Sequence, residues 1–362
     1  MKAEAYDRAG GSDAAHRVTS GAGGSEMRDA AGSGASGVRD SGAGGAGDGA
    51  TSDVSDGEAS GTADGGMSGA RDSGASDMTD SGPAAELIAL DGMLIDRQPL
   101  RSLAKGISLY LLTYMAQGLK VKGYLAVPES EGKLPAAIFC RGGIRKVGMV
   151  RKRRIFSMAR RGYVVFAPFY RGNEGGEGRE DFAGEDRLDV CHAIAMVRNL
   201  PEAAPGPVAL IGFSRGAMMA LLAARECPDA GPVVVWGGVS SLFDTYEERV
   251  DLRRMLKRVV GHPKKQLEAY EDRSPVYWAD RIHVPVMIVH GTADEQVSVD
   301  QARKLGLALE AAGKDYAMEL YDGLGHRFPK EDDERALDAV FAWITRKRAE
   351  MTGKGEGQRQ RG

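Results

Sequence analysis

The sequence predicts an α/β fold, a mostly parallel, doubly wound sheet with a leading antiparallel hairpin and a small helical insert. Three observations predict it. Short apolar runs without polar alternation, typical of strands buried on both faces, alternate with helical stretches over most of the chain. Two longer strand-like segments flank Gln117-Gly118, which indicates a hairpin turn. A charged segment rich in helix formers interrupts the alternation once, at residues 240–282.

The elements are expected in the following chain order. The hairpin strands cover 107–116 and 119–127. The later strands are expected at 136–140, 163–169, 208–213, 233–236, 286–290 and 317–321. The helices are expected at 147–161, 186–200, 214–226, 299–312 and 332–349. The segment 240–282 is expected to pack over one end of the sheet.

Composition divides the 362 residues into three parts. About 60 of the first 83 residues are Gly, Ala, Ser or Asp, and Leu, Ile, Phe and Trp are absent there. Such a segment cannot bury enough apolar surface to offset the entropy lost on ordering it. We therefore expect a disordered tail over 1–83, one α/β domain over 84–350 with its insert at about 240–282, and a disordered C-terminus over 351–362.

Charge and hydropathy exclude several classes of protein. The net charge of −3 combines a tail of about −8 with a body of about +5, too weakly basic for a nucleic-acid-binding surface. The sequence has no run of about 18 apolar residues, so no membrane span is predicted. The N-terminus lacks the apolar core of a secretory signal.

The cysteines and the glycine-rich run 171–178 carry weaker information. Cys140, Cys191 and Cys227 are few, odd in number and set in apolar or helical surroundings, so we expect no disulfide framework and a reducing, cytoplasmic compartment. No spacing indicates a metal site, and no cofactor is expected. The run 171–178 lacks the Lys-Ser/Thr of a phosphate-binding loop and carries glutamates, which favours a rim of the functional site over a nucleotide site.

The motif Gly212-Phe213-Ser214-Arg215-Gly216 lies between an expected strand and an expected helix. A sharp strand-to-helix turn brings two backbones close, so small residues are needed on both sides of the serine. The turn would lift the Ser214 hydroxyl above the sheet, at a helix N-terminus that favours developing negative charge. The alternative is a glycine-flanked helix cap without chemistry.

A serine hydroxyl needs a base to take its proton, and His326 has the best position among the six histidines. It lies in a glycine-bearing loop after the last strand, where functional groups of such sheets gather. Asp294, in the loop after the preceding strand, can orient this base and stabilise its charged form. Glu295 is the fallback acid. The alternative is that Asp294 caps a turn and His326 is a surface residue.

Two backbone N–H groups are candidates to bind the oxyanion of an acyl-transfer reaction. One belongs to Arg215, directly after the serine. The other is expected in the loop Arg141-Gly142-Gly143-Ile144, where Gly143 is our choice and Ile144 the next. The alternative for this loop is a plain turn.

Together these residues resemble the catalytic domain of the prolyl oligopeptidase family of serine peptidases, within the α/β-hydrolase fold. The resemblance covers essentially residues 117–349. Its landmarks are Gln117-Gly118-Leu119, Gly123-Tyr124-Leu125-Ala126-Val127-Pro128, Tyr170-Arg171-Gly172, Gly212-Phe213-Ser214-Arg215-Gly216, Pro285-Val286-Met287-Ile288-Val289-His290-Gly291, Asp294-Glu295-Gln296-Val297 and Gly325-His326-Arg327-Phe328. By this resemblance Ser214, Asp294 and His326 form the catalytic triad.

The chain departs from the family pattern at two places. The oxyanion loop has Arg141 where the family usually has histidine. Arg141 either pairs with an acidic residue of the 174–180 loop or with Asp186, the role we favour, or faces the cleft and binds an anionic substrate group. Second, many family members carry an N-terminal β-propeller, whereas the matching space here holds the low-complexity tail, which favours a free-standing peptidase or esterase domain.

The segment 238–249 resembles the family stretch that lines the first specificity pocket. The resemblance then implies an apolar wall made of Val239, Leu242, Phe243 and Tyr246. A core helix packed on the sheet is an equal alternative. The expected function is a serine hydrolase, foremost a peptidase cleaving amide bonds of small peptides through an acyl-enzyme. A carboxylesterase acting on small acyl esters is the first alternative, and a non-catalytic binding protein the second.

Overall fold

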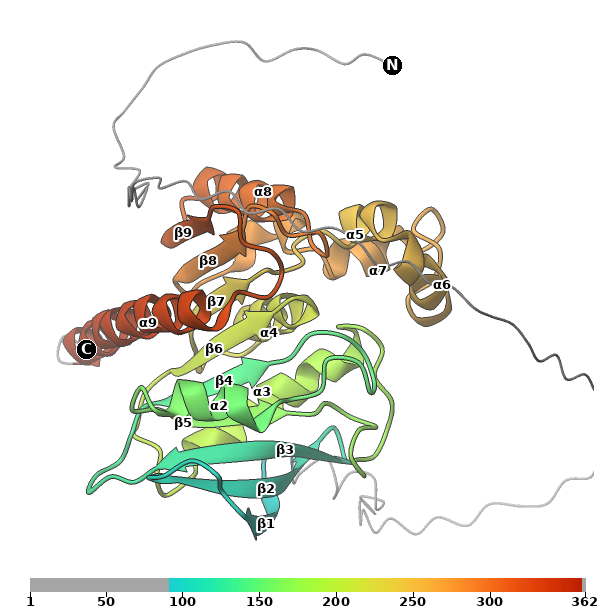
Figure 1. The fold of residues 1–362 in the computed structure, drawn as a ribbon. Coiled ribbons are helices and arrows are strands. Elements are labelled where there is room, and N and C mark those ends of the chain that lie inside the picture. The colour runs from blue at the N-terminus through green and yellow to red at the C-terminus, as the bar shows by residue number, and fades with distance from the viewer. Residues whose placement is uncertain (1–90, 360–362) are drawn as a thin grey trace, which may run out of the picture. The chain divides into compact units, whose positions relative to one another are not determined.

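The computed structural model describes residues 91–359, with side chains to residue 353 (Figure 1). The chain divides into two units, Met1–Thr79 and Asp80–Gly362, and the described residues all belong to the second. The tail expected over 1–83 therefore lies outside the described residues.

One nine-stranded sheet forms the centre of the described unit, in the order β1-β2-β3-β5-β4-β6-β7-β8-β9. Strands β1 to β3 and the β3–β5 pair are antiparallel, and all other pairs are parallel. The strands are β1 (Leu94–Leu100), β2 (Ile107–Ala116), β3 (Leu119–Pro128), β4 (Ala136–Cys140), β5 (Val164–Pro168), β6 (Val208–Phe213), β7 (Ala230–Trp236), β8 (Val286–Gly291) and β9 (Tyr316–Tyr321). This order confirms the predicted α/β fold with its leading hairpin.

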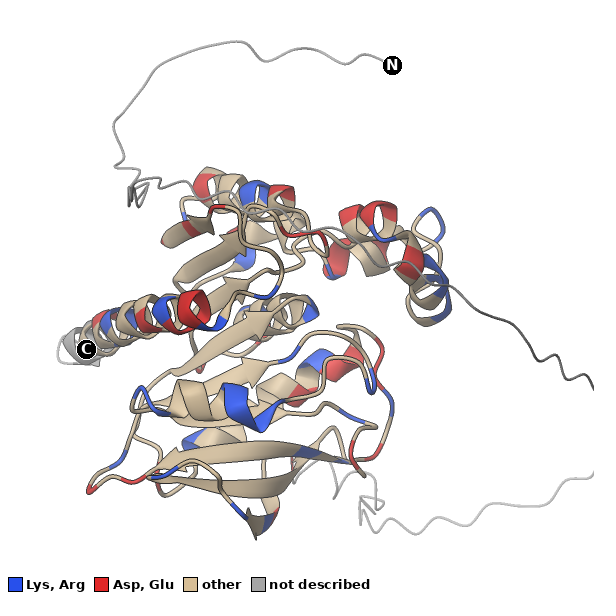
Figure 2. Ribbon diagram, in the orientation of Figure 1, with Lys and Arg blue, Asp and Glu red and all other residues tan. Residues whose placement is uncertain are grey.

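Helices cover both faces of the sheet (Figure 1). One hydrophobic core includes residues of α3 (Leu188–Arg198), α4 (Arg215–Glu226) and α8 (Val299–Ala311). The other core, on the opposite face, includes residues of α2 (Lys152–Ala159) and α9 (Lys330–Arg359). Figure 2 shows most charged residues on helices and loops, while the central strands are largely uncharged, as expected for strands buried on both faces.

The insert expected over 240–282 is helical, as predicted. It contains α5 (Leu242–Glu248), α6 (Val250–Val259) and α7 (Leu267–Asp272), followed by two short 3-10 helices, Pro275–Tyr277 and Ala279–Arg281. A third 3-10 helix, Glu185–Arg187, precedes α3. The insert follows β7 and returns the chain to β8.

Three differences from the expected elements exceed a shift of a few residues at one end. Strand β1 was not predicted, because this edge strand is polar at Asp96, Arg97 and Gln98 and lacks an apolar run. Helix α2 begins only at Lys152, since the residues before it form the loop after β4. Helix α9 continues to Arg359, so the disordered C-terminus is wrong for 351–359. Met351, in the last described turns of this helix, packs partly buried against the core.

The prediction that the cysteines form no disulfide is wrong for one pair. Cys191 in α3 and Cys227 at the end of α4 are bonded, and Cys140 is free and buried. The two helices pack side by side, which brings Cα atoms 36 residues apart in sequence to within 5.9 Å. The expectation of a reducing compartment rested on the absence of disulfides, so it loses its support. Within residues 91–359, no helix combines the length and hydropathy needed to cross a bilayer.

Candidate active site

Ser214 occupies the predicted sharp turn between β6 and α4. Its backbone has φ 57° and ψ −124°, a left-handed conformation that a non-glycine residue adopts only when its surroundings impose it. A side chain at Gly212 would collide with the backbone of Gly216 and Ala217, and one at Gly216 would collide with the Cys140 carbonyl. The motif therefore needs its glycines because the strand, the turn and the helix approach so closely.

Backbone hydrogen bonds fix this turn to the end of β7. The Ser214 N–H donates to the Trp236 carbonyl at 3.0 Å, and the Val239 N–H donates to the Ser214 carbonyl at 3.2 Å. The serine side chain is half-buried at the N-terminus of α4, a helix of 12 residues. The hydroxyl is thus presented at the carboxyl edge of the sheet, near a positive helix end.

The structure brings His326 and Asp294 together, as predicted. His326 Nδ1 lies 2.8 Å from Asp294 Oδ2, and both side chains are buried. Because an ionised carboxylate can only accept, Nδ1 carries the proton and Nε2 is left free to act as a base. Glu295, the fallback acid, is exposed and makes no hydrogen bond to His326.

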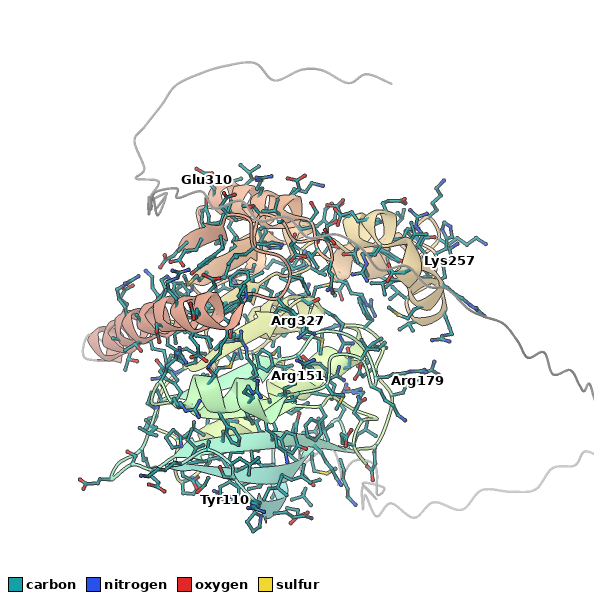
Figure 3. The ribbon with its side chains drawn as sticks, in the orientation of Figure 1. Tyr110, Arg151, Arg179, Lys257, Glu310 and Arg327 are labelled. Atoms are coloured by element: carbon teal, nitrogen blue, oxygen red, sulfur yellow. A yellow bond between two sulfur atoms is a disulfide. The ribbon has the colours of Figure 1, made fainter. Side chains whose placement is uncertain are left out.

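The loops beside the serine enclose this pair. The ring of Phe213 lies 4.7 Å from the ring of His326, centroid to centroid, and the guanidinium carbon of Arg327, a residue labelled in Figure 3, lies 5.7 Å from the centroid of the Phe213 ring. Gly237, at the end of β7, lies against both His326 and Asp294, so a side chain there would crowd them. Ser214 Oγ and His326 Nε2 are not hydrogen-bonded to each other in this structure. Such contacts commonly tighten only when substrate binds.

Hydrogen bonds keep Asp294 ionised. Burial raises the pKa of its carboxyl, but hydrogen bonds from His290, His326 and the Val297 N–H lower the pKa by more, to a value well below the ordinary one. Oδ1 accepts from the backbone N–H groups of Gln296 at 2.8 Å and Val297 at 3.0 Å. An anion held this way orients the imidazole and stabilises its protonated form.

His290 is a site residue that the sequence did not single out. It is fully buried at the end of β8, with Nε2 at 2.9 Å from the Val297 carbonyl and 3.3 Å from Asp294 Oδ2. Nε2 carries the proton because a carbonyl only accepts. His290 therefore supports Asp294 from behind. Its place at the end of a strand, four residues before the acid, was the available signal.

The loop that carries Gly143 packs against the serine, and Arg215 follows the serine in the chain. Gly142 packs against Ser214, since a side chain at Gly142 would reach within 2.8 Å of Ser214 Cβ. Gly143 has φ 66° and its N–H donates to no described residue. The Arg215 N–H opens α4, where a helix has no internal acceptor. Ile144, the second choice, is half-buried on the same loop.

Arg141 does not face a substrate. Its side chain is 1% exposed and forms an ion pair with Glu180, and it donates to the carbonyls of Phe169 at 2.8 Å and Gly142 at 3.1 Å. Its assignment as a substrate-binding residue is therefore wrong, and the structural role in the 174–180 loop holds. A buried guanidinium needs such partners to remain charged.

We expect Arg141→Ala and Arg141→Lys to lower both the melting temperature and the turnover. In the alanine variant the buried charge of Glu180 loses one of its positive partners, which should lower the free energy of unfolding by about 3 kcal/mol. A lysine at this position cannot reproduce the forked hydrogen bonds of the guanidinium group. Both losses should be equal for a neutral ester and for an ester with a terminal carboxylate. If only the acidic ester suffered while the melting temperature stayed unchanged, Arg141 would be a specificity residue.

The Arg215 side chain belongs to the same buried cluster. Its Nη1 lies 3.1 Å from Glu180 Oε2 and 3.4 Å from Asp186 Oδ2, and the side chain is 1% exposed. The guanidinium carbons of Arg215 and Arg141 each lie 5.0 Å from the centroid of the Tyr170 ring. Only the backbone N–H of Arg215 was expected to have a role, and its charge pair with Glu180 joins segments that are distant in sequence.

Burial raises the pKa of Asp186 to about 7, against the lowering effect of Arg215 and with a further increase from Asp181. Between about pH 4 and pH 7 the folded protein keeps a proton that the unfolded chain has released, so stability falls as pH rises through this window. From pH 5 to pH 7 the free energy of unfolding of the wild type should fall by about 2 kcal/mol relative to Asp186→Asn. Urea unfolding of both proteins at pH 5 and pH 7 measures this difference. Parallel profiles of unfolding free energy against pH for the two proteins would contradict the prediction.

The expected apolar wall is mostly core. Val239, Leu242 and Tyr246 are buried in the hydrophobic core beneath α5, so their assignment to a substrate pocket is wrong and the core-helix alternative holds. They pack inward because α5 caps that core. Phe243 alone is half-buried, with its ring 5.1 Å from the ring of Tyr270.

A cavity of about 710 Å³ lies beside the loop after β4. The loop after β4 and the glycine-rich loop after β5 line it, so the expectation that 171–178 forms a rim agrees with its position. Its apolar part includes Ile144, Val147 and Met149, and its polar part includes Arg145 and Arg179. A cavity of this size accommodates a few residues of a peptide.

Comparisons with known proteins bear on the family and the fold. The model of the prolyl oligopeptidase family matches residues 149–350. YtmA, an uncharacterized peptidase of Bacillus subtilis (strain 168), is 42% identical over 254 residues, which cover 70% of this chain and 99% of that protein.

Two solved structures share the fold. The acylaminoacyl peptidase of Pyrococcus horikoshii aligns with a TM-score of 0.59 and 22% identity over 67% of this chain and 42% of its own. A puromycin-hydrolyzing peptidase of Mycobacterium tuberculosis aligns with a TM-score of 0.57 and 26% identity over 64% of this chain and 38% of its own. This chain thus spans less than half the length of either solved peptidase. With the matched family model, the close relative and the fold, the chain belongs to the prolyl oligopeptidase family of serine peptidases.

Proposed function

We propose that this chain hydrolyses amide bonds of short peptides through an acyl-enzyme on Ser214. The observation that carries the proposal is the buried Asp294–His326 pair, 2.8 Å apart, beside a serine held at φ 57° at a helix N-terminus. These features support nucleophilic acyl transfer, in which an oriented imidazole takes the proton of a serine.

In the proposed reaction Ser214 Oγ attacks the carbonyl carbon of the scissile bond while His326 Nε2 takes the hydroxyl proton. The carbonyl oxygen becomes an oxyanion and accepts from the N–H groups of Gly143 and Arg215. Collapse of this intermediate breaks the C–N bond, and His326 returns the proton to the leaving amine. Water, deprotonated by His326, then attacks the acyl-enzyme and releases the acid, which restores Ser214.

Two observations support a peptidase. The cavity next to the loop after β4 has about 710 Å³, enough for a small number of residues, and its lining combines apolar residues such as Ile144 and Val147 with charged residues such as Arg145 and Glu174. The Bacillus relative is matched over 99% of its length, which supports a peptidase built from this domain alone.

A carboxylesterase would use the same triad and the same oxyanion donors, so only the leaving group distinguishes the two activities. We expect the protein to cleave an aminoacyl p-nitroanilide with a kcat/KM within about 100-fold of that for the p-nitrophenyl ester of the same acyl group. Turnover of the ester with no detectable turnover of the anilide would favour the esterase. A set of matched pairs with different acyl groups keeps specificity from being mistaken for leaving-group preference.

A further inference from the structure

One buried carboxylate connects the segments that carry the two candidate oxyanion donors. Glu180 is 3% exposed and lies in the loop between β5 and α3. Its Oε1 accepts from the side chains of Arg141 and Asn173. Its Oε2 accepts from the backbone N–H of Arg145 at 3.1 Å and lies 3.1 Å from Arg215 Nη1.

These contacts surround the oxyanion site from both sides. Arg141 and Arg145 bracket Gly143 in the loop after β4, so fixing the side chain of one and the N–H of the other fixes both ends of the turn. Arg145 itself has φ 54°, a left-handed conformation that its bond to Glu180 helps to hold. Arg215 supplies the other N–H, and its guanidinium is anchored by the same carboxylate.

We propose that Glu180 is a positioning residue that sets the distance between the Gly143 and Arg215 N–H groups, and so shapes the oxyanion hole of the reaction proposed above. Glu180 is nearly fully buried and would act through the two segments that it binds. An oxyanion hole stabilises the transition state only when its donors are held at hydrogen-bond distance from the developing charge. A single carboxylate that binds both segments can hold both N–H donors in place.

The plainer role for Glu180 is to neutralise the buried guanidinium groups of Arg141 and Arg215, with an effect on stability alone. Asp189 offers a matched case. It is fully buried and accepts from Arg171 Nε at 3.0 Å, Nη2 at 2.8 Å and the backbone N–H at 2.7 Å. It is therefore an equally buried carboxylate paired with an arginine, but it contacts neither oxyanion segment.

The experiment compares Glu180→Gln and Asp189→Asn with the wild type. For each protein we would measure the melting temperature, kcat and KM for one p-nitrophenyl ester, and the inhibition constant of a peptidyl trifluoromethyl ketone. The hemiketal oxygen of this inhibitor occupies the oxyanion site. Both variants should melt at lower temperature, since each leaves a buried arginine with less compensation.

Only Glu180→Gln should lose catalysis. We expect its kcat to fall by about 10²-fold or more, its KM to stay within about threefold, and the affinity for the ketone to fall by a factor similar to that for kcat. Asp189→Asn should keep its kcat and its ketone affinity within about threefold of the wild type. Equal losses of kcat in both variants, or unchanged ketone affinity in Glu180→Gln, would overturn the proposal.

If Glu180→Gln does not fold, Glu180→Asp replaces it. Aspartate keeps the charge but is one methylene shorter, so it cannot reach all four partners at once. The same loss of kcat at constant KM is expected, with a smaller change in melting temperature, and a kcat within about threefold of the wild type would overturn the proposal. Turnover by the wild type in the same assay tests the proposed function separately, because the proposal concerns only the ratio of variant to wild type.

Discussion

Ser214→Ala should abolish hydrolysis, with a fall in kcat on the order of 10⁶-fold, while the protein stays folded. The substitution removes one half-buried oxygen and keeps the Cβ that packs against Gly142. The turn itself depends on its glycines and on the bond from the Ser214 N–H to Trp236, which alanine retains. Turnover of the matched ester and anilide, together with the melting temperature of the purified variant, measures the effect.

Ser130→Ala is the control for this measurement, because Ser130 is an exposed loop serine that lines a different cavity. Its kcat should equal that of the wild type within about twofold. A Ser214→Ala protein that kept near wild-type turnover after purification would remove Ser214 from the nucleophile role.

Asp294→Asn should lower kcat by about 10⁴-fold with little change in KM. The carboxylate accepts from His326 Nδ1 and so leaves Nε2 free to act as a base. An asparagine amide can donate to Nδ1 instead, which favours the tautomer with the proton on Nε2 and removes the base. Steady-state kinetics on the ester measure the loss.

Glu295→Gln is the matched control for the acid. Glu295 is the neighbouring residue, is exposed and carries the same charge, so its variant should keep kcat within about threefold. A large loss in Glu295→Gln with little loss in Asp294→Asn would reverse the assignment of the triad acid.

Much of the fold follows from the sequence because its strands are buried on both faces. Strands such as β4 and β6 consist almost entirely of apolar residues, and the structure places both at the predicted bounds. Strand β1 escaped prediction because an edge strand is exposed and keeps polar residues. The disulfide between Cys191 and Cys227 escaped it because pairing depends on how α3 packs against α4, which a spacing of 36 residues does not show.

The candidate triad could be predicted for a geometric reason. Ser214, Asp294 and His326 each follow a parallel strand, and the carboxyl ends of β6, β8 and β9 meet at one edge of the sheet. The expected pairing of Arg141 with the 174–180 loop did not single out Glu180, and no such rule locates the side chain of Arg215. Their contacts join loops that are distant in sequence. The sequence of a charged loop does not show which of its charged residues is buried.

The pocket residues show the limit of a resemblance. Val239 and Leu242 lie in the segment that resembles a specificity-pocket stretch, but here they face the core under α5. A run of apolar residues on a short helix indicates burial and does not tell a pocket from a core. The cavity beside Ile144 and Val147 was found only from the arrangement of two loops.

The most direct test of the central claim, that Ser214 is the nucleophile of a serine peptidase, is the site of covalent labelling by a fluorophosphonate. The reagent phosphonylates an activated serine and releases fluoride. We expect one adduct per chain, carried by the proteolytic fragment that contains Ser214, no adduct in Ser214→Ala, and slower labelling in Asp294→Asn. Equal labelling of the wild type and Ser214→Ala, or no labelling of the folded wild type, would contradict the account and favour a different nucleophile or a non-catalytic binding protein.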